Sequence, residues 1–531
     1  MQTRTTIHWS PVVRATAAAI LAIAAWYANA DVCPGCETRE VAAPTRRGTV
    51  RGTLFLPPAQ HEALPVVLVS HGYLASGAFL KVPWAADITG LGATALFLDR
   101  WGHGRSDGAW WPPGEASEVH TPDDLAPDLA SALASLRRLE PLIDPWRIAL
   151  LGHSDGGTTA LLAASADWDV RATVALSPSA APWEFLNHVA PRNLLLIFGE
   201  ADDILPAEGR ALMMNAATRG YLAGPGTYGS FSHGSARQLT TVPSVGHVGV
   251  LYSDAARLET LMWFKRALDL PGPIGLAQLR FGWVYLGLAA LQVLLWWPRS
   301  GNPAAVQPAS PQAPRPGVAL LGAGIVCCAW AMGLLAAPRL AAAMPSLPAQ
   351  ETGMLGAILT SEGGALALAL IALAGLGMPS PAQPATRGYW SVVGGAFAGA
   401  GYAVVLFAGV HVLGWHLIAF PTDATRIALW GFYALVSLPF FAVVEAVMAR
   451  ATGSRIAHAG ALLAAAISLA FAAPVLAARM GVVPVYLLAA AVVLLALSVA
   501  GGVSSTWGVA GRAILAAVVL GRAIAVTCPL F

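Results

Sequence analysis

RIALLGHSDGGTTALLAAS, residues 147–165, is the stretch that decides the fold of the first half of this chain. An apolar run leads directly into Gly152-His153-Ser154-Asp155-Gly156, and an Ala- and Leu-rich segment follows. A nucleophile elbow needs this order: a strand, a turn so tight that only small residues fit two places before and after the serine, and a helix. The stretch therefore predicts that Ser154 is a nucleophile, with a helix N-terminus behind it that favours developing negative charge.

A second Gly-x-Ser-x-Gly, around Ser106, lacks this context. DRWGHGR precedes Ser106 and GAWWPPG follows it, and neither segment can form the required strand or helix. Its glycines are typical of a loop. We therefore predict that Ser154, and not Ser106, is the reactive serine.

Further apolar runs without alternation lie on both sides of the elbow. They are rich in Val, Ile and Leu, as in strands that are buried on both faces of a parallel sheet. Between two of them, residues 121–139 carry leucines at helical spacing. Strand and helix in repetition predict a doubly wound, mostly parallel α/β domain over residues 45–270. The runs are LPVVLVSHG from Leu64, ATALFLD from Ala93, RIALLGHS from Arg147, VRATVALSP from Val170 and RNLLLIFGE from Arg192.

With these motifs in this order, the domain resembles the α/β-hydrolase superfamily, specifically the compact dienelactone-hydrolase and serine-aminopeptidase-like esterases and peptidases. The resemblance rests on VSHGYLAS, DRWGHGRSDG, GHSDGG, FGEADDILP and SVGHVG, and it covers slightly under half of the chain. It implies a catalytic triad of Ser154 as nucleophile, Asp202 as acid and His247 as general base. Asp203, the neighbour of Asp202, is the alternative acid.

The resemblance also implies an oxyanion hole. One donor would be the backbone N–H of Asp155, just after the nucleophile. The other would be the backbone N–H of Tyr73 in HGY, or alternatively its hydroxyl group. The carboxylate of Asp155 is expected to face solvent or a neighbouring base.

Four other histidines lie in glycine-containing turns: His71, His103, His153 and His233. Those at 71 and 103 belong to loop motifs that support structure in the family. His233 is the main rival for the general base, because it lies between the acid and the end of the domain. It lacks the strand-then-turn approach that QLTTVPSVGH provides for His247.

The resemblance implies an open active site. Caps in this fold are often inserted before the strand that bears the acid, and here only SAAPWEFLNHVAP, residues 179–191, is available. We therefore expect no large cap, which suits bulky or membrane-presented substrates. Trp110 and Trp111, in a nearby insertion, are interpreted as core or membrane-interface residues in preference to a substrate platform. Because metal-ligand spacing, a phosphate loop and a dinucleotide fingerprint are all missing, no cofactor or metal is expected.

The whole chain is too apolar for a soluble globular protein. Its 531 residues are 56% hydrophobic and 11% charged, whereas about a quarter of residues are charged in soluble domains. After Leu270 the chain becomes a series of apolar segments, which predicts an all-α transmembrane bundle of about eight helices over residues 279–531. The expected spans are 279–297, 317–337, 353–377, 391–418, 427–449, 456–477, 482–502 and 507–527. A net charge of +2 without a Lys/Arg cluster argues against a nucleic-acid partner.

Residues 1–30 have the pattern of an export signal. Basic Arg4 and Arg14 accompany the apolar stretch ATAAAILAIAAWY, and Ala28-Asn29-Ala30 has the small-x-small form of a cleavage site. Whether cleaved or retained as an anchor, this segment places the next domain outside the cytoplasm. We expect it on the outer face of a bacterial inner membrane. The loops due to face the cytoplasm carry more arginines than the others (299, 315, 387, 450, 455 and 512 against 339, 426 and 479), which favours the same orientation.

Two smaller features have competing interpretations. Cys33 and Cys36, in CPGC, are interpreted as a local disulfide in preference to a redox or metal pair, because no thioredoxin-like βαβ pattern surrounds them. Glu362 lies within an apolar segment and is a functional candidate by default, although pairing with Arg522 would explain it equally.

These features together predict a membrane-bound serine hydrolase. We expect it to cleave carboxylic esters of small molecules or lipids through an acyl-enzyme on Ser154, with membrane lipids as its other partners. The alternatives are an acyltransferase that passes the acyl group to a lipid or glycan, a peptidase, and a transporter or sensor whose outer domain only binds ligand. The complete triad argues against the last of these. The sequence leaves the oligomeric state open.

Overall fold

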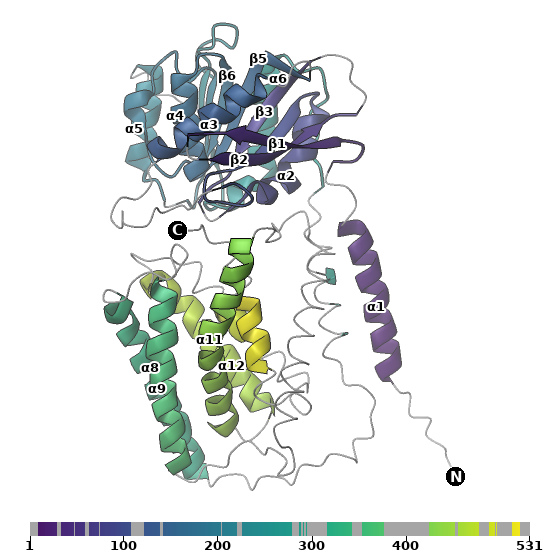
Figure 1. The fold of residues 1–531 in the computed structure, drawn as a ribbon. Coiled ribbons are helices and arrows are strands. Elements are labelled where there is room, and N and C mark those ends of the chain that lie inside the picture. Colours follow the sequence, from purple (N-terminus) through teal and green to yellow (C-terminus); the bar gives the residue numbers. More distant parts are fainter. Residues whose placement is uncertain are drawn as a thin grey trace. The chain divides into compact units, whose positions relative to one another are not determined.

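Eight strands form a single mixed sheet in the first half of the chain, in the order β1-β2-β4-β3-β5-β6-β7-β8 (Figure 1). β2 pairs antiparallel with β1 and with β4, and all other pairs are parallel. The expected mostly parallel sheet is therefore confirmed. The strands are β1 (Glu37–Pro44), β2 (Thr49–Leu56), β3 (Leu64–Ser70), β4 (Thr94–Asp99), β5 (Ile143–His153), β6 (Val170–Leu176), β7 (Leu194–Gly199) and β8 (Arg237–Val242).

These strands belong to a computed structural model that describes part of the chain. The described residues are 9–28, then 33–278 apart from 47, 59–62, 74, 108–121, 139–141, 203 and 220–225, then 316–341, 353–375, 424–451 and 455–476, with parts of 286–294, 488–495 and 512–520. They divide into two compact units, one within residues 29–281 and the other made of residues up to 28 and from 282 onward. Trp110 and Trp111 lie outside the described residues.

Helices cover both faces of the sheet (Figure 1). Successive residues of a strand point to opposite faces, and β3 divides accordingly: Val67 and Val69 belong to one apolar cluster, and Val66 and Leu68 to the other. α2 and α6 complete the first cluster, and α3 and α4 the second. Burial on both faces explains the continuous apolar runs of the central strands. The helices are α2 (Gly77–Gly90), α3 (Pro122–Leu136), α4 (Asp155–Ala166), α5 (Ala207–Thr218) and α6 (Asp254–Leu268).

The sequence did not reveal β1 and β2. Only Val41 and Ala43 of the eight residues of β1 are buried, so the strand lacks a readable apolar pattern. It also begins before residue 45, where the domain was expected to start. At the other end, the unit extends past residue 270, because buried Asp87 accepts a hydrogen bond from the backbone N–H of Ala277 at 2.6 Å.

The second unit is helical throughout its described residues. α8 packs along α9, α9 packs against α11, and α11 against α12. One described segment, Ile427–Met448, is long and apolar enough to cross a membrane, and shorter apolar stretches lie in the other four helices. The expected span at 391–418 lies outside the described residues, and those at 279–297, 482–502 and 507–527 are described only in part. The helices are α1 (Trp9–Ala28), α8 (Pro316–Ala341), α9 (Gly353–Gly375), α11 (Ala424–Ala451) and α12 (Arg455–Leu476).

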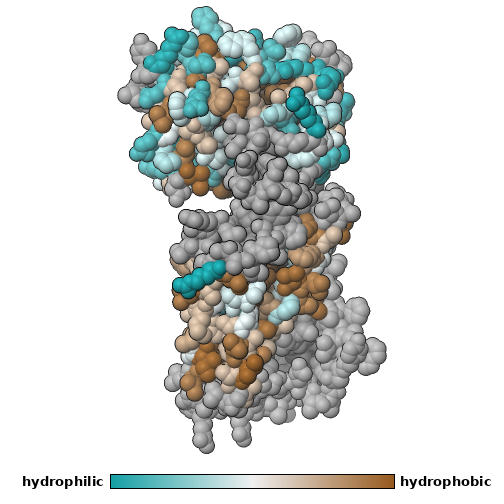
Figure 2. Space-filling view, turned by 60° about the vertical axis from the view of Figure 1, so that its left-hand side comes forward, coloured by the Kyte–Doolittle hydropathy of each residue, from teal (hydrophilic) through white to brown (hydrophobic). Residues whose placement is uncertain are grey.

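Apolar side chains cover much of the described surface of this helical unit, whereas the surface of the sheet-containing unit is largely polar (Figure 2). Leu335 is 74% exposed and Phe471 is 80% exposed. Inside the helical unit, buried Glu445 forms an ion pair with Arg512, at 2.5 Å between Oε2 and Nη2. Glu362 is buried beside Gly333. Its suggested partner Arg522 lies outside the described residues.

Candidate active site

The strand-to-helix turn after β5 places Ser154 at the carboxyl edge of the sheet. Ser154 has a φ of 55° and a ψ of −124° and directly precedes α4. A Cβ on Gly152 would lie 2.2 Å from the carbonyl oxygen of Gly156, and one on Gly156 would lie 2.3 Å from that of His71. Only glycine fits at either position, which is the physical reason for the Gly-x-Ser-x-Gly spacing.

The structure brings Ser154, His247 and Asp202 together. The hydroxyl of Ser154 lies 2.8 Å from Nε2 of His247. Nδ1 of His247 lies 3.1 Å from each carboxylate oxygen of Asp202. A neutral imidazole satisfies both contacts when Nδ1–H donates to the carboxylate and Nε2 accepts the hydroxyl proton. The three side chains come from the segments after β5, β7 and β8, which end at the same edge of the sheet.

Asp202 is held as a carboxylate. Its side chain is 1% exposed. Burial by itself would raise the pKa of Asp202, but the hydroxyl of Ser177, the backbone N–H of Ile204 and the ring of His247 outweigh burial and lower this pKa below its usual value. The guanidinium of Arg210 also donates to the backbone carbonyl of Asp202 and, at 2.8 Å, to that of Leu205. The loop that carries the acid is therefore fixed. Asp203, the alternative acid, lies outside the described residues.

His153 supports His247, the candidate general base, through a hydrogen bond to its backbone. Its Nε2 lies 2.9 Å from the backbone carbonyl of His247, which accepts a hydrogen bond from a neutral His153 ring. Burial lowers the pKa of His153 to about 4, so the ring is uncharged at neutral pH. The sequence suggests His153 only as a rival base, because the contact that reveals its role joins residues that are 94 positions apart.

His71 orders the loop that carries Tyr73. The ring accepts the backbone N–H of Arg100 at Nε2, at 3.0 Å, and its Nδ1–H donates to the carbonyl of Gly72 at 2.7 Å. Burial, reinforced by the charge of Arg100, lowers the pKa of His71 to about 4 and keeps the ring neutral. Gly72 packs directly against Ser154. Tyr73 is thus carried by a segment that touches the nucleophile; its role in an oxyanion hole stays a prediction.

Asp155 begins α4, so its backbone N–H has no partner within the helix. Its carboxylate forms a buried ion pair with Arg100, at 2.7 Å between Oδ2 and Nη2. Arg100 also donates to the carbonyl of His71 at 3.1 Å. The carboxylate of Asp155 was expected to face either solvent or a basic side chain, and the structure shows it paired with the basic side chain of Arg100. The pair ties the start of α4 to the loop after β4.

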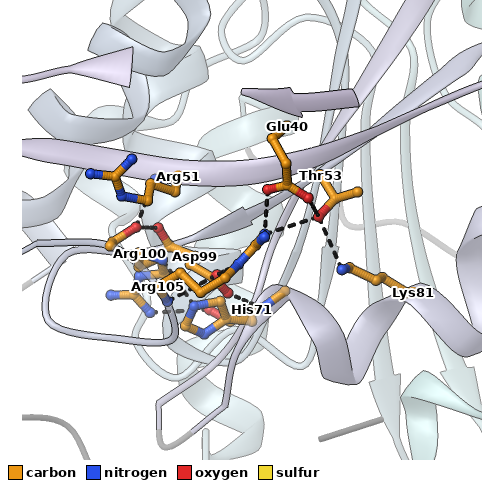
Figure 3. Close-up of polar contacts among 10 residues, drawn as sticks. Glu40, Arg51, Thr53, His71, Lys81, Asp99, Arg100 and Arg105 are labelled. Atoms are coloured by element: carbon orange, nitrogen blue, oxygen red, sulfur yellow. Dashed lines mark hydrogen bonds and ion pairs between the residues drawn. The ribbon is translucent and has the colours of Figure 1, made fainter. Parts of the chain in front are cut away.

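Ser106 has a structural role in the hydrogen-bond network around Arg51, Asp99 and Arg105, which Figure 3 labels. Its hydroxyl donates to the carbonyl of Asp99 and accepts the backbone N–H of Arg51 at 2.8 Å. Both hydrogen-bonding functions of the hydroxyl are occupied, and the residue is 9% exposed. Arg105 continues the network to Glu40 and Thr53. The second Gly-x-Ser-x-Gly is therefore a loop anchor.

The remaining rival histidines are far from a catalytic arrangement. Nδ1 of His103 lies 2.9 Å from the carbonyl of Trp101 within the loop after β4, and the ring is buried. His233 is exposed in the turn before β8. Among the described residues, no group of three or more His, Cys, Asp or Glu side chains is arranged to hold a metal ion.

Comparison with known proteins agrees with this architecture. Residues 61–206 match the family model described as serine aminopeptidase, S33, a segment that includes Ser154 and Asp202 and ends before His247. The chain is 32% identical over 136 residues to Thiohydrolase apmlB of Arthrinium phaeospermum, covering 26% of this chain and 41% of that protein. It is 34% identical over 130 residues to Thiohydrolase aneE of Aspergillus aculeatus, covering 24% and 37%. The chain thus spans less than half the length of the curated relatives it matches.

Solved structures similar to the domain share little sequence with it. The α/β hydrolase GrgF from a Penicillium species is 18% identical, with a TM-score of 0.34, and covers 44% of this chain and 100% of its own. A dienelactone hydrolase from Anabaena variabilis is 19% identical, with a TM-score of 0.32, and covers 44% and 99%. The strand order, the elbow and the family match identify the sheet-containing unit: this chain contains an α/β-hydrolase domain of the serine-hydrolase type.

Proposed function

We propose that this protein is a membrane-bound serine hydrolase that cleaves small-molecule or lipid esters through an acyl-enzyme on Ser154. The observation that carries the proposal is the continuous hydrogen-bonded line from Ser154 through His247 to a buried, ionised Asp202. A serine hydroxyl is a weak nucleophile unless a positioned base takes its proton. This line supplies the base and fixes its tautomer.

Acylation follows from this geometry. Nε2 of His247 takes the Ser154 proton as Oγ attacks the ester carbonyl carbon, and Asp202 stabilises the imidazolium that forms. Negative charge develops on the carbonyl oxygen, for which the N–H of Asp155 at the start of α4 and a donor of Tyr73 are the proposed partners. The imidazolium then protonates the leaving alkoxide, and the acyl group remains on Ser154.

Deacylation repeats the proton transfers with water. His247 takes a proton from water, the resulting hydroxide attacks the acyl carbon, and the proton returns to Oγ of Ser154 as the carboxylic acid leaves. Through hydrogen bonds to backbone carbonyls, His153 holds His247 in position and Arg210 holds Asp202 in position during these proton transfers.

The described segment between β6 and β7 is short and leaves room for a bulky substrate. It contains only the short 3-10 helix η1 (Trp183–Phe185), so it adds no cap over the site. Trp183 and Phe185 are 45% and 50% exposed there. The two curated relatives are named thiohydrolases, and a thioester is attacked by the same route with a thiolate as leaving group. Oxygen esters are the first substrate class to test and thioesters the second.

We also propose that the helical unit lies in a bacterial inner membrane and that the hydrolase domain faces away from the cytoplasm. Support comes from the segment Ile427–Met448 of α11, which is long and apolar enough to cross a membrane, from the exposed apolar side chains of the helical unit and from the export pattern of residues 1–30. The disulfide between Cys33 and Cys36 fits an oxidising compartment.

The decisive experiment labels membranes that contain the full chain with a fluorophosphonate probe. Labelling should be lost in Ser154→Ala and His247→Ala and kept in Ser106→Ala, which changes the matched serine in the other Gly-x-Ser-x-Gly. A charged probe that cannot cross membranes should label intact spheroplasts, because the domain faces outward. A separate sample of the same preparation, not treated with the probe, can then be assayed with matched oxygen-ester, thioester and amide substrates.

Three outcomes would contradict the proposal. If folded natural protein does not react with the probe, the site binds without catalysis, as in the sensor alternative. If the probe reacts but esters are hydrolysed only slowly until an alcohol acceptor is added, the protein is an acyltransferase. Preferential amide cleavage would identify a peptidase.

A further inference from the structure

CPGC, at the start of the hydrolase unit, forms a turn that is closed by a backbone hydrogen bond as well as by the disulfide. The backbone N–H of Cys36 donates to the carbonyl of Cys33 at 3.0 Å. Pro34 occupies the second position of the turn, and Gly35, with a φ of +80°, the third. This is the arrangement of a type II turn, which requires glycine or asparagine at the third position. The two cysteines would therefore remain neighbours after reduction.

A buried hydroxyl group faces both sulfurs. Oγ1 of Thr89, in the last turn of α2, lies 3.0 Å from Sγ of Cys33 and 3.6 Å from Sγ of Cys36. The Thr89 hydroxyl donates its own proton to the carbonyl of Ala85, at 2.8 Å. Its lone pairs are thus available to the sulfurs. A disulfide has no proton to donate, whereas a thiol does, so this acceptor is useful only to the reduced pair.

The two sulfurs differ in access. Cys33 is 4% exposed and packs in the same apolar cluster as Ile88 and Leu91. Cys36 is half-buried. Both cysteines line a shallow cavity of about 550 Å³ that is open to the surface. A thiolate that enters this cavity would therefore attack the sulfur of Cys36, which is the more exposed of the two. The buried sulfur of Cys33 would then be the leaving group.

We propose that Cys33 and Cys36 form a redox-active pair that exchanges with a protein dithiol entering this cavity. A thiolate of the dithiol attacks Sγ of Cys36, the Cys33–Cys36 bond breaks, and Cys33 leaves as a thiolate that takes a proton from solvent. The second thiol of the partner loses its proton and attacks the partner's first sulfur, which is bonded to Cys36 in the mixed disulfide. Cys36 leaves as a thiolate and takes up a proton. Two electrons pass to the pair, and the partner becomes a disulfide. This activity is separate from Ser154 chemistry.

The test equilibrates the full chain, in detergent, with defined mixtures of reduced and oxidised glutathione. After acid quenching and alkylation, mass spectrometry measures the fraction of the CPGC peptide in the dithiol form. The folded chain should pass reversibly between the two forms. Thr89→Val should lower the dithiol-to-disulfide ratio about fivefold to tenfold through loss of the acceptor, where tenfold is about 30 mV for two electrons. Thr89→Ser should restore it.

Thr260→Val is the matched control. Thr260 is buried in α6 and donates to the carbonyl of Ala256 at 2.8 Å, as Thr89 does to that of Ala85. The Thr260→Val variant therefore loses an equivalent hydrogen bond within a helix, but away from the sulfurs. Its dithiol-to-disulfide ratio should equal that of the natural chain. In single-cysteine variants, the Cys36 that remains in Cys33→Ser should form a mixed disulfide with glutathione at least about tenfold faster than the Cys33 that remains in Cys36→Ser.

Fluorophosphonate labelling of Ser154 in the same samples shows whether the domain is folded. A pair that stays oxidised until this labelling is lost would overturn the proposal and make the disulfide purely structural. Equal shifts in Thr89→Val and Thr260→Val would overturn it as well. Because the redox readout does not use Ser154 activity, a failure here is distinguishable from a failure of the proposed hydrolase function.

Discussion

At Asp202, hydrogen bonds overcome burial. A carboxylate with a side chain that is 1% exposed would ordinarily favour its protonated form. The hydroxyl of Ser177, the backbone N–H of Ile204 and the ring of His247 stabilise the charged form instead, and the pKa of Asp202 is lowered. The acid is thus ready to orient His247 throughout the neutral pH range, and its amide analogue would lack the charge that stabilises the imidazolium.

Asp202→Asn should therefore slow fluorophosphonate labelling of Ser154 by about three to four orders of magnitude, because an amide cannot stabilise the imidazolium and can impose the wrong tautomer. Asp203→Asn is the control, since it changes the adjacent carboxylate, and its labelling rate should stay within about threefold of the natural chain. The measurement is the second-order labelling rate constant. The reverse pattern would assign the acid to Asp203.

At the scale of elements, the elbow between β5 and α4 depends on close backbone contact. Gly156 and Gly157 are neighbours in the first turn of α4 and differ in surroundings. A Cβ on Gly156 would lie 2.3 Å from the carbonyl oxygen of His71, whereas one on Gly157 would meet nothing closer than 3.2 Å. The segment at His71 is itself tied down by Arg100 and cannot easily move away.

Gly156→Ala should destabilise the hydrolase domain by several kcal/mol, the range of overpacking against backbone that cannot yield. Gly157→Ala should be close to neutral, because alanine improves helix propensity by roughly 1 kcal/mol and offsets a mild contact. The temperature at which Ser154 labelling is irreversibly lost reports the difference. Equal behaviour of the two variants would mean that the elbow tolerates a side chain facing β3.

For the whole molecule, the candidate site belongs to one unit. Ser154, Asp202 and His247 all lie within residues 29–281, as do the apolar clusters on both faces of the sheet. The end of this unit is fixed by the buried pair of Asp87 and Arg257. Arg257 donates to the carbonyl of Ala277 at 2.8 Å, and Asp87 accepts the N–H of the same residue. Burial raises the pKa of Asp87 to about 6, so this carboxylate depends on those donors.

A chain of residues 29–281 should accordingly fold and label at Ser154 within about threefold of the full protein. A chain of residues 29–270 should unfold at a temperature lower by about 5 °C or more, because buried Asp87 and Arg257 each lose a hydrogen-bond partner. Thermal unfolding followed by circular dichroism compares the two. Identical melting temperatures would show that residues 271–281 add nothing to the unit.

The sequence by itself determined the α/β class, the mostly parallel sheet and the choice of Ser154 over Ser106. These follow from local patterns, because a strand buried on both faces is a continuous apolar run and an elbow needs glycine at fixed spacing. The resemblance to hydrolases supplied Asp202 and His247 as candidates. The edge strand β1 was not readable because only two of its residues are buried. The continuation of the domain past residue 270 was not readable because the Pro- and Gly-rich residues 271–275 are typical of a boundary.

Only the tertiary structure decided how the candidates meet and what supports them. His153 reaches His247 across 94 positions, Arg100 reaches Asp155 across 55, and Thr89 reaches Cys33 across 56. Such contacts depend on which strands end at one edge of the sheet and which helix covers which face. A sequence pattern records what each segment prefers locally, whereas these pairs exist only once the strand order has closed the distance between them.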